Sequence, residues 1–117
     1  MGKGAYGTRD AGAKRIRVLF VCHGNICRSA MAQCVMQQLV DEAGLSGAFT
    51  IDSAATTNEE IGNPLYPPAR KKLMAEGVPI VPHYARRVQA GEQAGWDCIV
   101  VMDEENNLLF SDYMRHF

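Results

Sequence analysis

Cys22 and Arg28 lie six positions apart in the stretch VCHGNICRS, residues 21–29. A cysteine thiolate can attack an electrophilic atom, and a guanidinium presents a planar fork to two oxygens of a tetrahedral anion. A cysteine and an arginine at this spacing occur often by chance. The significance of the pair therefore depends on the residues between them and on the elements at either end.

The residues between Cys22 and Arg28 suit a loop that holds an anion. We expect Gly24 to permit backbone dihedral angles that a side chain would forbid, while Asn25 tolerates left-handed geometry and can bond across the loop through its amide. Backbone N–H groups that converge in such a loop would bind a phosphate-like anion and favour Cys22 as a thiolate. Ser29 could add a hydroxyl hydrogen bond to the sulfur. The predicted chemistry is transfer of a phosphoryl group to Cys22.

A buried strand before the loop and a helix after it would position these groups. The segment RIRVLFVC, residues 15–22, contains an uninterrupted apolar run typical of a strand buried on both faces of a parallel sheet. From Arg28, apolar residues recur at helical spacing, and Gly44 is suited to end the helix. The apolar stripe of this helix consists of Met31, Val35 and Leu39, with Cys34 and Val40 beside them. The positive end of the helix dipole would add to the anion site.

The rest of the chain continues the alternation of strands and helices. A strand, a helix, an extended loop, a strand and the start of a helix are predicted in turn at residues 49–53, 67–77, 78–88, 97–102 and from Asp103. This order predicts an α/β fold, a three-layer sandwich in which helices cover both faces of a central parallel sheet. Ligands of such sheets bind at the carboxyl ends of the strands, where residues 22–29 lie.

Length and composition limit what the chain can be. With 117 residues and 47% hydrophobic content we expect one domain, at residues 15–117, preceded by a flexible tail at residues 1–14. The net charge of −1 gives no basic field, so no nucleic-acid partner is expected. No apolar run approaches the ~18 residues of a membrane span and no secretory signal is visible. We therefore expect a cytoplasmic protein with free thiols and no membrane partner.

Two other interpretations of the loop compete with an anion site: a polar turn with a structural cysteine, and a zinc site. A polar turn with a structural buried cysteine would not need the interleaved glycine, asparagine and serine. A zinc site needs four ligands, and Cys22, His23 and Cys27 have no second cysteine or histidine pair nearby. No metal and no other cofactor is therefore predicted. Cys34 and Cys98 lie on apolar faces and are expected in the core.

Three stretches of the chain resemble the low-molecular-weight protein-tyrosine phosphatases. VCHGNICRSAMAQ is similar to the phosphate loop of that family, IDSAAT to the stretch at its second strand, and VVMDEENNLLF to its third strand and the following helix. The resemblance implies a phosphotyrosine phosphatase I-like sheet of order 2-1-3-4. It also implies a hydrolase for protein dephosphorylation, in which Cys22 forms a phosphocysteine intermediate and Arg28 binds phosphate. The implied phosphate-binding loop consists of Cys22, His23, Gly24, Asn25, Ile26, Cys27 and Arg28.

Further residues acquire roles from the resemblance. Asn25 and Ser53 would brace the loop, and Ser29 would activate the thiol. Cys27 would form a reversible disulfide with Cys22 that protects the nucleophile from irreversible oxidation, and a small buried side chain is the alternative role. The segment PHYARR would lie near the site or be exposed and structural, and it contains His83, Arg86 and Arg87.

The implied substrate is a phosphotyrosine protein or a small aryl phosphate, with phosphate as the bound anion. Ile26 resembles the tyrosine-directed members, whereas a threonine at that position resembles the protein arginine phosphatases. Arsenate reductases that share the loop need two further cysteines close together, and only Cys98 is available. Tyr66 is the candidate aromatic wall of the substrate cleft, and a Pro-rich surface turn is the alternative.

The chain departs from the family pattern towards its C-terminal end. It has no Asp-Pro dipeptide, which carries the general acid in the family, and it ends at Phe117, so strand 4 and the acid loop are expected to be missing. The alternative function is a catalytically impaired domain that binds phosphate or phosphotyrosine. Residues 97–102 would then form an exposed edge available for self-association. No replacement acid is assigned to the downstream carboxylates, Asp97, Asp103, Glu104 and Asp112.

Overall fold

The computed structural model describes residues 15–102. The tail predicted at residues 1–14, the helix predicted from Asp103 and the carboxylates of Glu104 and Asp112 lie outside the described residues. None of the helices within residues 15–102 is long and apolar enough to cross a membrane.

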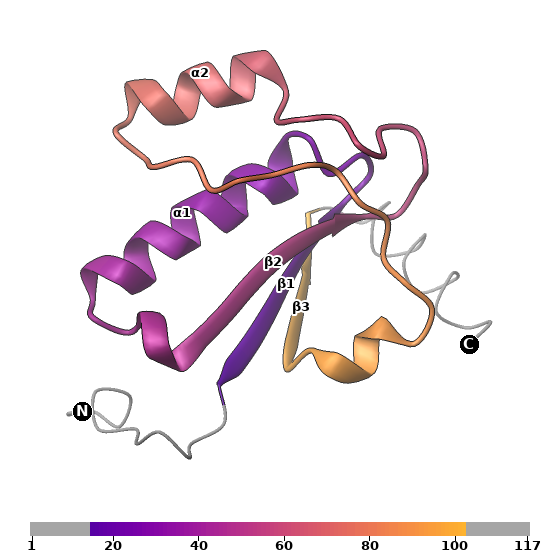
Figure 1. Cartoon of the computed structure of the whole chain (residues 1–117), viewed down its shortest axis with the longest axis horizontal. Coiled ribbons are helices and arrows are strands. Elements are labelled where there is room, and N and C mark those ends of the chain that lie inside the picture. Colours follow the sequence, from indigo (N-terminus) through magenta and orange to yellow (C-terminus); the bar gives the residue numbers. More distant parts are fainter. Residues whose placement is uncertain (1–14, 103–117) are drawn as a thin grey trace.

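Three parallel strands form the sheet, with β1 in the middle (Figure 1). The elements in chain order are β1 (Ile16–Cys22), α1 (Arg28–Glu42), the 3₁₀ turn η2 (Ser46–Ala48), β2 (Phe49–Ala55), α2 (Pro67–Ala75), the 3₁₀ turn η3 (Glu92–Gly95) and β3 (Cys98–Val101). The strand order is β2-β1-β3. The predicted α/β fold is confirmed, with a parallel sheet whose first three strands have the expected order.

The register brings the carboxyl ends of the strands to one edge of the sheet. Cys22, the last residue of β1, pairs with Ala55, the last residue of β2, and Val21 pairs with Val101 of β3. The loop that follows Cys22 therefore starts at the edge where parallel sheets bind their ligands. β2 extends beyond the predicted strand at residues 49–53 because its pairing with β1 continues to Ala55.

Helices α1 and α2 lie on one face of the sheet, where α1 packs against β1 and β2 (Figure 1). The buried cluster between the helices consists of Ala30, Cys34, Leu65, Ala69 and Leu73. A second cluster joins the strands to the segment before β3, and its buried members are Leu19, Val21, Ala54 and Val88. Trp96 packs against this second cluster. Each face of β1 is thus covered, which explains the uninterrupted apolar run in its sequence.

α1 buries only part of the apolar stripe predicted from its sequence. Cys34 and Val40 are buried and Met31 packs against the cluster between the helices, whereas Val35 and Leu39 are 39% and 59% exposed. The buried residues of the helix are mostly small or polar: Ser29, Ala30, Gln33, Cys34 and Val40. Ala30 and Cys34 pack in the cluster with α2, and Gln33 bonds to Ser53 and Ile51 of β2, so these smaller and polar positions meet the neighbouring elements.

The two cysteines predicted to lie in the core have different surroundings. Cys34 is 1% exposed in the cluster between α1 and α2, as predicted. Cys98 is exposed, so its predicted burial is wrong. Among the described strands, β3 pairs only with β1, and its first residue is left to solvent.

The predicted end of α1 is confirmed, since Gly44 has a φ of 73° directly after the C-cap residue Ala43.

The segment at residues 78–88 is extended, as predicted, and passes from α2 to the end of β2 (Figure 1). There Ala55 donates its N–H to the Arg86 carbonyl at 2.7 Å and accepts the Val88 N–H at 3.0 Å. Arg87 forms an isolated parallel bridge with Ala55. These contacts bring residues 83–87 beside the loop that follows β1.

Candidate active site

The sulfur of Cys22 receives hydrogen bonds from the loop and from the start of α1. The hydroxyl of Ser29 lies 3.0 Å from Cys22 Sγ, and the backbone N–H groups of Asn25 and Ser29 donate to the sulfur at 3.3 and 3.4 Å. Cys22 itself is 3% exposed. Donors aimed at a sulfur stabilise negative charge that develops on it, so the arrangement suits a sulfur that takes part in charge transfer.

Asn25 is the central residue of the loop. It has a φ of 61° and is fully buried, which confirms the predicted left-handed geometry. Its side-chain Nδ2 donates to Ser29 Oγ at 2.9 Å, and its Oδ1 accepts the backbone N–H of Arg86 at 3.1 Å. His83 donates from Nε2 to the Asn25 carbonyl oxygen at 2.5 Å. The predicted bonding of the Asn25 amide across the loop is therefore confirmed.

Gly24 serves the loop in a different way from the one predicted. Its φ is not positive, so the prediction that it adopts dihedral angles forbidden to a side chain is wrong. A Cβ atom at this position would lie 3.1 Å from Cγ of Glu60, closer than side chains normally pack. The glycine therefore leaves space for the side chain of Glu60, and Asn25 is the residue that adopts the left-handed conformation.

The carbonyl groups of the loop are held from outside by flanking segments. Thr56 donates its N–H to the Cys22 carbonyl at 3.0 Å, and Thr57 donates its hydroxyl to the His23 carbonyl at 3.0 Å. Tyr66 donates its N–H to the Ile26 carbonyl at 2.8 Å. A loop whose carbonyls are bound on its outer side has its N–H groups available for the inner side, as an anion site requires.

The N-terminus of α1 completes the site. Arg28 is the first residue of the helix and is exposed, and no side chain caps the helix at Cys27. Uncapped N–H groups and the positive end of the helix dipole attract an anion to this point. Cys27 is partly buried and packs against the α1–α2 cluster.

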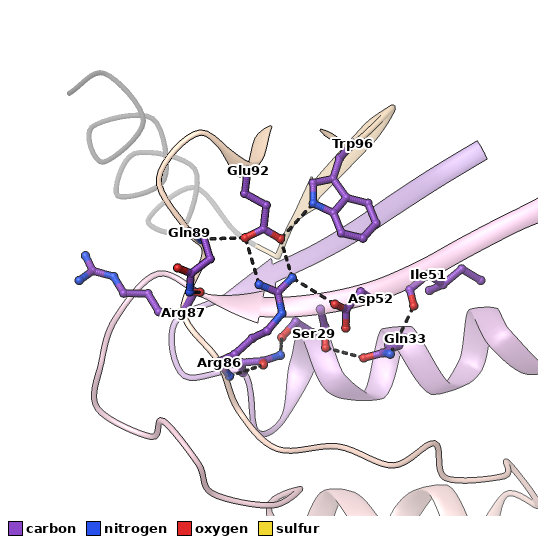
Figure 2. Close-up of polar contacts among 11 residues, drawn as sticks. Ser29, Gln33, Ile51, Asp52, Arg86, Arg87, Gln89, Glu92 and Trp96 are labelled. Atoms are coloured by element: carbon purple, nitrogen blue, oxygen red, sulfur yellow. Dashed lines mark hydrogen bonds and ion pairs between the residues drawn. The ribbon is translucent and has the colours of Figure 1, made fainter. Parts of the chain in front are cut away.

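Ser53 and Tyr66 make their hydrogen bonds to residues other than Cys22. The hydroxyl of Ser53 donates to Gln33 Oε1 at 2.5 Å. Figure 2 shows the other contact of this amide, in which Gln33 Nε2 donates to the Ile51 carbonyl at 3.5 Å. Ser53 is thereby joined to α1 behind the loop. Tyr66 is 47% exposed at the N-cap position of α2. Its backbone contacts the loop, whereas its role as an aromatic wall stays a prediction.

Arg86 is the centre of a charged network next to the loop (Figure 2). Its Nη2 and Nη1 lie 2.6 and 3.0 Å from the two carboxylate oxygens of Glu92, and Nη2 also lies 3.1 Å from Asp52 Oδ2. Glu92 in turn accepts the Gln89 N–H at 2.7 Å and Trp96 Nε1–H at 3.0 Å. Sequence reasoning placed Arg86 near the site but missed Asp52, Glu92 and Trp96, since nothing in their spacing marks them as its partners.

Two charged groups of this network, Arg86 and Glu92, have shifted pKa values. The hydrogen bond to Glu92 raises the pKa of Arg86 above its ordinary value, and the attraction of Asp52 adds to this effect against partial burial. Burial by itself would raise the pKa of Glu92, but the hydrogen bonds from Arg86, Gln89 and Trp96, together with the charge of Arg86, lower it overall. Both shifts favour the charged pair.

The residues predicted to bind phosphate thus lie together in one loop and at the start of α1. Among residues 15–102, no cluster of three or more histidine, cysteine, aspartate or glutamate side chains could hold a metal ion. His23 and Glu59 form an exposed pair at 3.1 Å. What the arrangement offers is a buried sulfur that faces backbone N–H groups at the start of a helix.

Comparison with known proteins identifies relatives over most of the chain. A family described as low molecular weight phosphotyrosine protein phosphatase matches residues 17–114. The low molecular weight phosphotyrosine protein phosphatase of Homo sapiens is 43% identical over 89 residues, 76% of this chain and 56% of that protein. The low molecular weight protein-tyrosine-phosphatase YfkJ of Bacillus subtilis is 41% identical over 78% of this chain and 58% of that protein.

Solved structures agree with these matches. The crystal structure of YfkJ from Bacillus subtilis superimposes with a TM-score of 0.83 and 36% identity, covering 87% of this chain and 64% of that one. The crystal structure of a Drosophila arginine phosphatase superimposes with a TM-score of 0.77 and 31% identity, covering 85% and 61%. The chain therefore spans a little more than half the length of the curated relatives that it matches.

Proposed function

The chain belongs to the family of low molecular weight phosphotyrosine protein phosphatases, and from this premise we propose that it hydrolyses phosphotyrosine by transferring the phosphoryl group to Cys22. The observation that carries the proposal is the set of three hydrogen bonds at Cys22 Sγ beside the N-terminus of α1, two from backbone N–H donors and one shared with the Ser29 hydroxyl. A sulfur so placed is both activated and adjacent to the position where an anion is attracted.

In the proposed first step the Cys22 thiolate attacks the phosphorus of a bound monoester. The S–P bond forms while the P–O bond to the tyrosine oxygen breaks, and the leaving oxygen departs with the electron pair and takes up a proton. The N–H groups of the loop and the guanidinium of Arg28 would neutralise the charge on the three non-bridging oxygens. The step needs no metal and no organic cofactor.

In the second step water attacks the phosphocysteine. The new P–O bond forms, the S–P bond breaks, and inorganic phosphate and the thiolate are released. Ser29 would support this step because its hydroxyl, at 3.0 Å from Cys22 Sγ, can donate to the sulfur as charge returns to it. The same hydroxyl would thus assist both attack and departure of the thiolate.

Tyrosine is the proposed phosphorylated residue. Ile26 in the loop resembles tyrosine-directed members, and the exposed ring of Tyr66 offers a surface for an aromatic substrate. A solved relative is an arginine phosphatase by its name, so phosphoarginine is the competing substrate. A comparison of kcat/KM on matched phosphotyrosine and phosphoarginine peptides separates the two, and a preference for phosphoarginine would contradict the tyrosine assignment.

A second candidate function is recognition of phosphate or phosphotyrosine without turnover. It is favoured by the state of the two carboxylates beside the loop, since Glu59 pairs with His23 and Glu60 accepts a hydrogen bond from Asn63 at 2.7 Å. Such engaged carboxylates are poorly placed to donate a proton to a leaving group. Phosphotyrosine, with a poor leaving group, would be affected more than an activated aryl phosphate.

The decisive experiment measures hydrolysis of p-nitrophenyl phosphate and of a phosphotyrosine peptide by the wild type and by Cys22→Ser. We expect both substrates to be turned over and the substitution to reduce kcat by more than about 10³-fold, as loss of a nucleophile typically does. Cys98→Ser is the matched control, because Cys98 is exposed at the opposite end of the sheet. Peptide binding by calorimetry without turnover of either substrate would support recognition instead.

The resemblance also supports a redox role for Cys27 and a reducing location. We expect a reversible disulfide between Cys27 and Cys22 under oxidation, so that a reductant restores activity after peroxide treatment in the wild type but not in Cys27→Ser. Equal recovery in both would contradict this role.

A catalytic thiol needs a reducing compartment, which supports a cytoplasmic location that cell fractionation can test.

A further inference from the structure

We propose that Glu92 is a positioning residue for the Cys22 thiol, because it holds Arg86 where the Arg86 backbone N–H fixes the side-chain amide of Asn25. The effect on catalysis rests on the proposed function. The effect on the sulfur does not, since reactivity of a thiol can be measured without any phosphatase turnover.

The Arg86 N–H selects the direction of the Asn25 amide. The backbone N–H of Arg86 can only donate, so the atom of Asn25 that faces it at 3.1 Å is the acceptor Oδ1. Nδ2, which can only donate, then faces Ser29 Oγ at 2.9 Å. If the Arg86 N–H moved away, the amide would lose the contact that selects this orientation over the flipped one.

The direction of the Asn25 amide in turn sets the direction of the Ser29 proton. Because Asn25 Nδ2–H donates to Ser29 Oγ, that oxygen acts as an acceptor on one side and its own O–H proton is left for Cys22 Sγ at 3.0 Å. In the flipped amide, Oδ1 would face Ser29 and compete with the sulfur for the same proton. The amide orientation therefore decides whether the hydroxyl stabilises the thiolate.

Arg86 is held in place by Glu92. Its guanidinium is bound at two points by Glu92, and the Glu92 carboxylate is itself fixed by the Gln89 N–H and by Trp96 Nε1 (Figure 2). The side chain of Glu92 is only 14% exposed, so the pair is shielded from solvent. Asp52 of β2 provides a further contact at 3.1 Å. The segment that carries the Arg86 N–H is thus clamped to the turn at residues 89–96.

The effect of altering Glu92 on the Arg86 N–H is limited, because backbone hydrogen bonds to Ala55 hold the same segment. Ala55 binds the backbone on both sides of Arg87, through the Arg86 carbonyl and the Val88 N–H. This bridge keeps the segment on β2 even when Glu92 is altered. Removing the Glu92 carboxylate should therefore loosen the N–H contact with Asn25 without detaching the segment.

The test is the rate at which iodoacetamide alkylates Cys22, followed by mass spectrometry of the peptide that contains it, between pH 5 and 9. We expect Glu92→Gln to slow alkylation about 3- to 10-fold at pH 6, the loss expected for one weakened hydrogen bond. Towards pH 9, above the reference pKa of about 8.5 for a cysteine thiol, the variant and wild-type rates should draw together. Glu76→Gln, which alters an exposed pair with Lys72 on α2, is the control and should match the wild type.

A double-mutant cycle shows whether Glu92 acts through Asn25. Asn25→Gly removes the amide and tolerates the positive φ, so Glu92→Gln should have no further effect on alkylation in that background. If Glu92→Gln does not fold, as judged by circular dichroism, Trp96→Phe replaces it, with an expected slowing of about twofold. An unchanged rate in the wild-type background, or equal slowing in both backgrounds, would overturn the proposal. None of these results depends on phosphatase activity.

Discussion

Asn25 combines a left-handed backbone with complete burial and contacts on every polar atom of its side chain. Glycine would satisfy the backbone, but it could not bridge Ser29 and the Arg86 N–H. Aspartate would place a negative charge next to the thiolate, and alanine would adopt the positive φ only with strain. Asparagine is the residue that meets the conformational and the hydrogen-bonding requirement together.

Substitution of Asn25 by alanine should destabilise the fold. We expect Asn25→Ala to lower the free energy of unfolding by roughly 2–4 kcal/mol, from strain at the positive φ and from leaving buried polar groups unpaired. Asn25→Gly should lose less, because it avoids the strain. Urea unfolding measures both, with Asn63→Ala as an exposed control. Equal losses for alanine and glycine would show that the φ angle carries no cost.

The residues of the loop were predictable from the sequence to the extent that their chemistry is local. Cys22, Asn25, Ser29 and Arg28 lie within one short stretch, and a turn between a strand and a helix brings such residues together. The partners contributed by distant segments were not predictable in the same way. The Arg86 N–H meets Asn25 only because an extended segment folds back onto the end of β2.

At the scale of elements, the segment from Arg86 to Trp96 behaves as a clamp at the carboxyl end of β2. The hydrogen bonds from Arg86, Gln89 and Trp96 that lower the pKa of Glu92 are made only in the folded state. A carboxylate with a lowered pKa when folded contributes stability above its unfolded pKa of about 4.3, and loses that contribution as the pH falls through the folded value.

Stability should therefore depend on Glu92 in a pH-dependent manner. At pH 7 we expect Glu92→Gln to reduce the free energy of unfolding by roughly 1–3 kcal/mol, since hydrogen bonds to a charged group are lost. The difference from the wild type should shrink as the pH falls below about 4.3. Urea unfolding at pH 7, 5 and 3.5 measures it. A difference that stays constant over this range would mean that the charge of Glu92 does not contribute.

The elements themselves were largely predictable, but the buried face of α1 was not. Strand positions follow from continuous apolar runs, and helix ends from Pro67 and Gly44, because those signals act on the local backbone. Which side of a helix is buried depends on which elements pack on it. Ala30 and Cys34 are buried against α2, whereas Val35 and Leu39 stay exposed, and periodicity within α1 does not show where α2 will lie.

At the scale of the whole molecule, two surfaces are suited to association with a partner. Within residues 15–102, β3 pairs with β1 and has no second neighbour. On the helical face, Phe20, Val35, Leu39 and Phe49 line an apolar groove between α1 and the sheet. Parallel strands are normally covered on both faces and paired on both sides in the interior of a sheet, so both features favour association.

We expect the 117-residue chain to self-associate through the open edge of β3. Sedimentation equilibrium in the presence of a reductant should show an apparent mass that rises with protein concentration, and Cys98→Lys should shift the protein toward monomer, because a lysine on an edge strand opposes pairing. Lys72→Gln on α2 is a control that changes a charge away from this edge. A stable monomer at all concentrations would contradict self-association.

The central claim is that Cys22 carries the phosphoryl group during turnover. Rapid acid quenching of the protein during reaction with p-nitrophenyl phosphate, followed by mass spectrometry of the peptide that contains Cys22, tests it directly. We predict a phosphoryl group on Cys22 within the first turnover and none on the same peptide of Cys22→Ser. Release of p-nitrophenol with no phosphorylation of Cys22, or with phosphate on another residue, would contradict the claim.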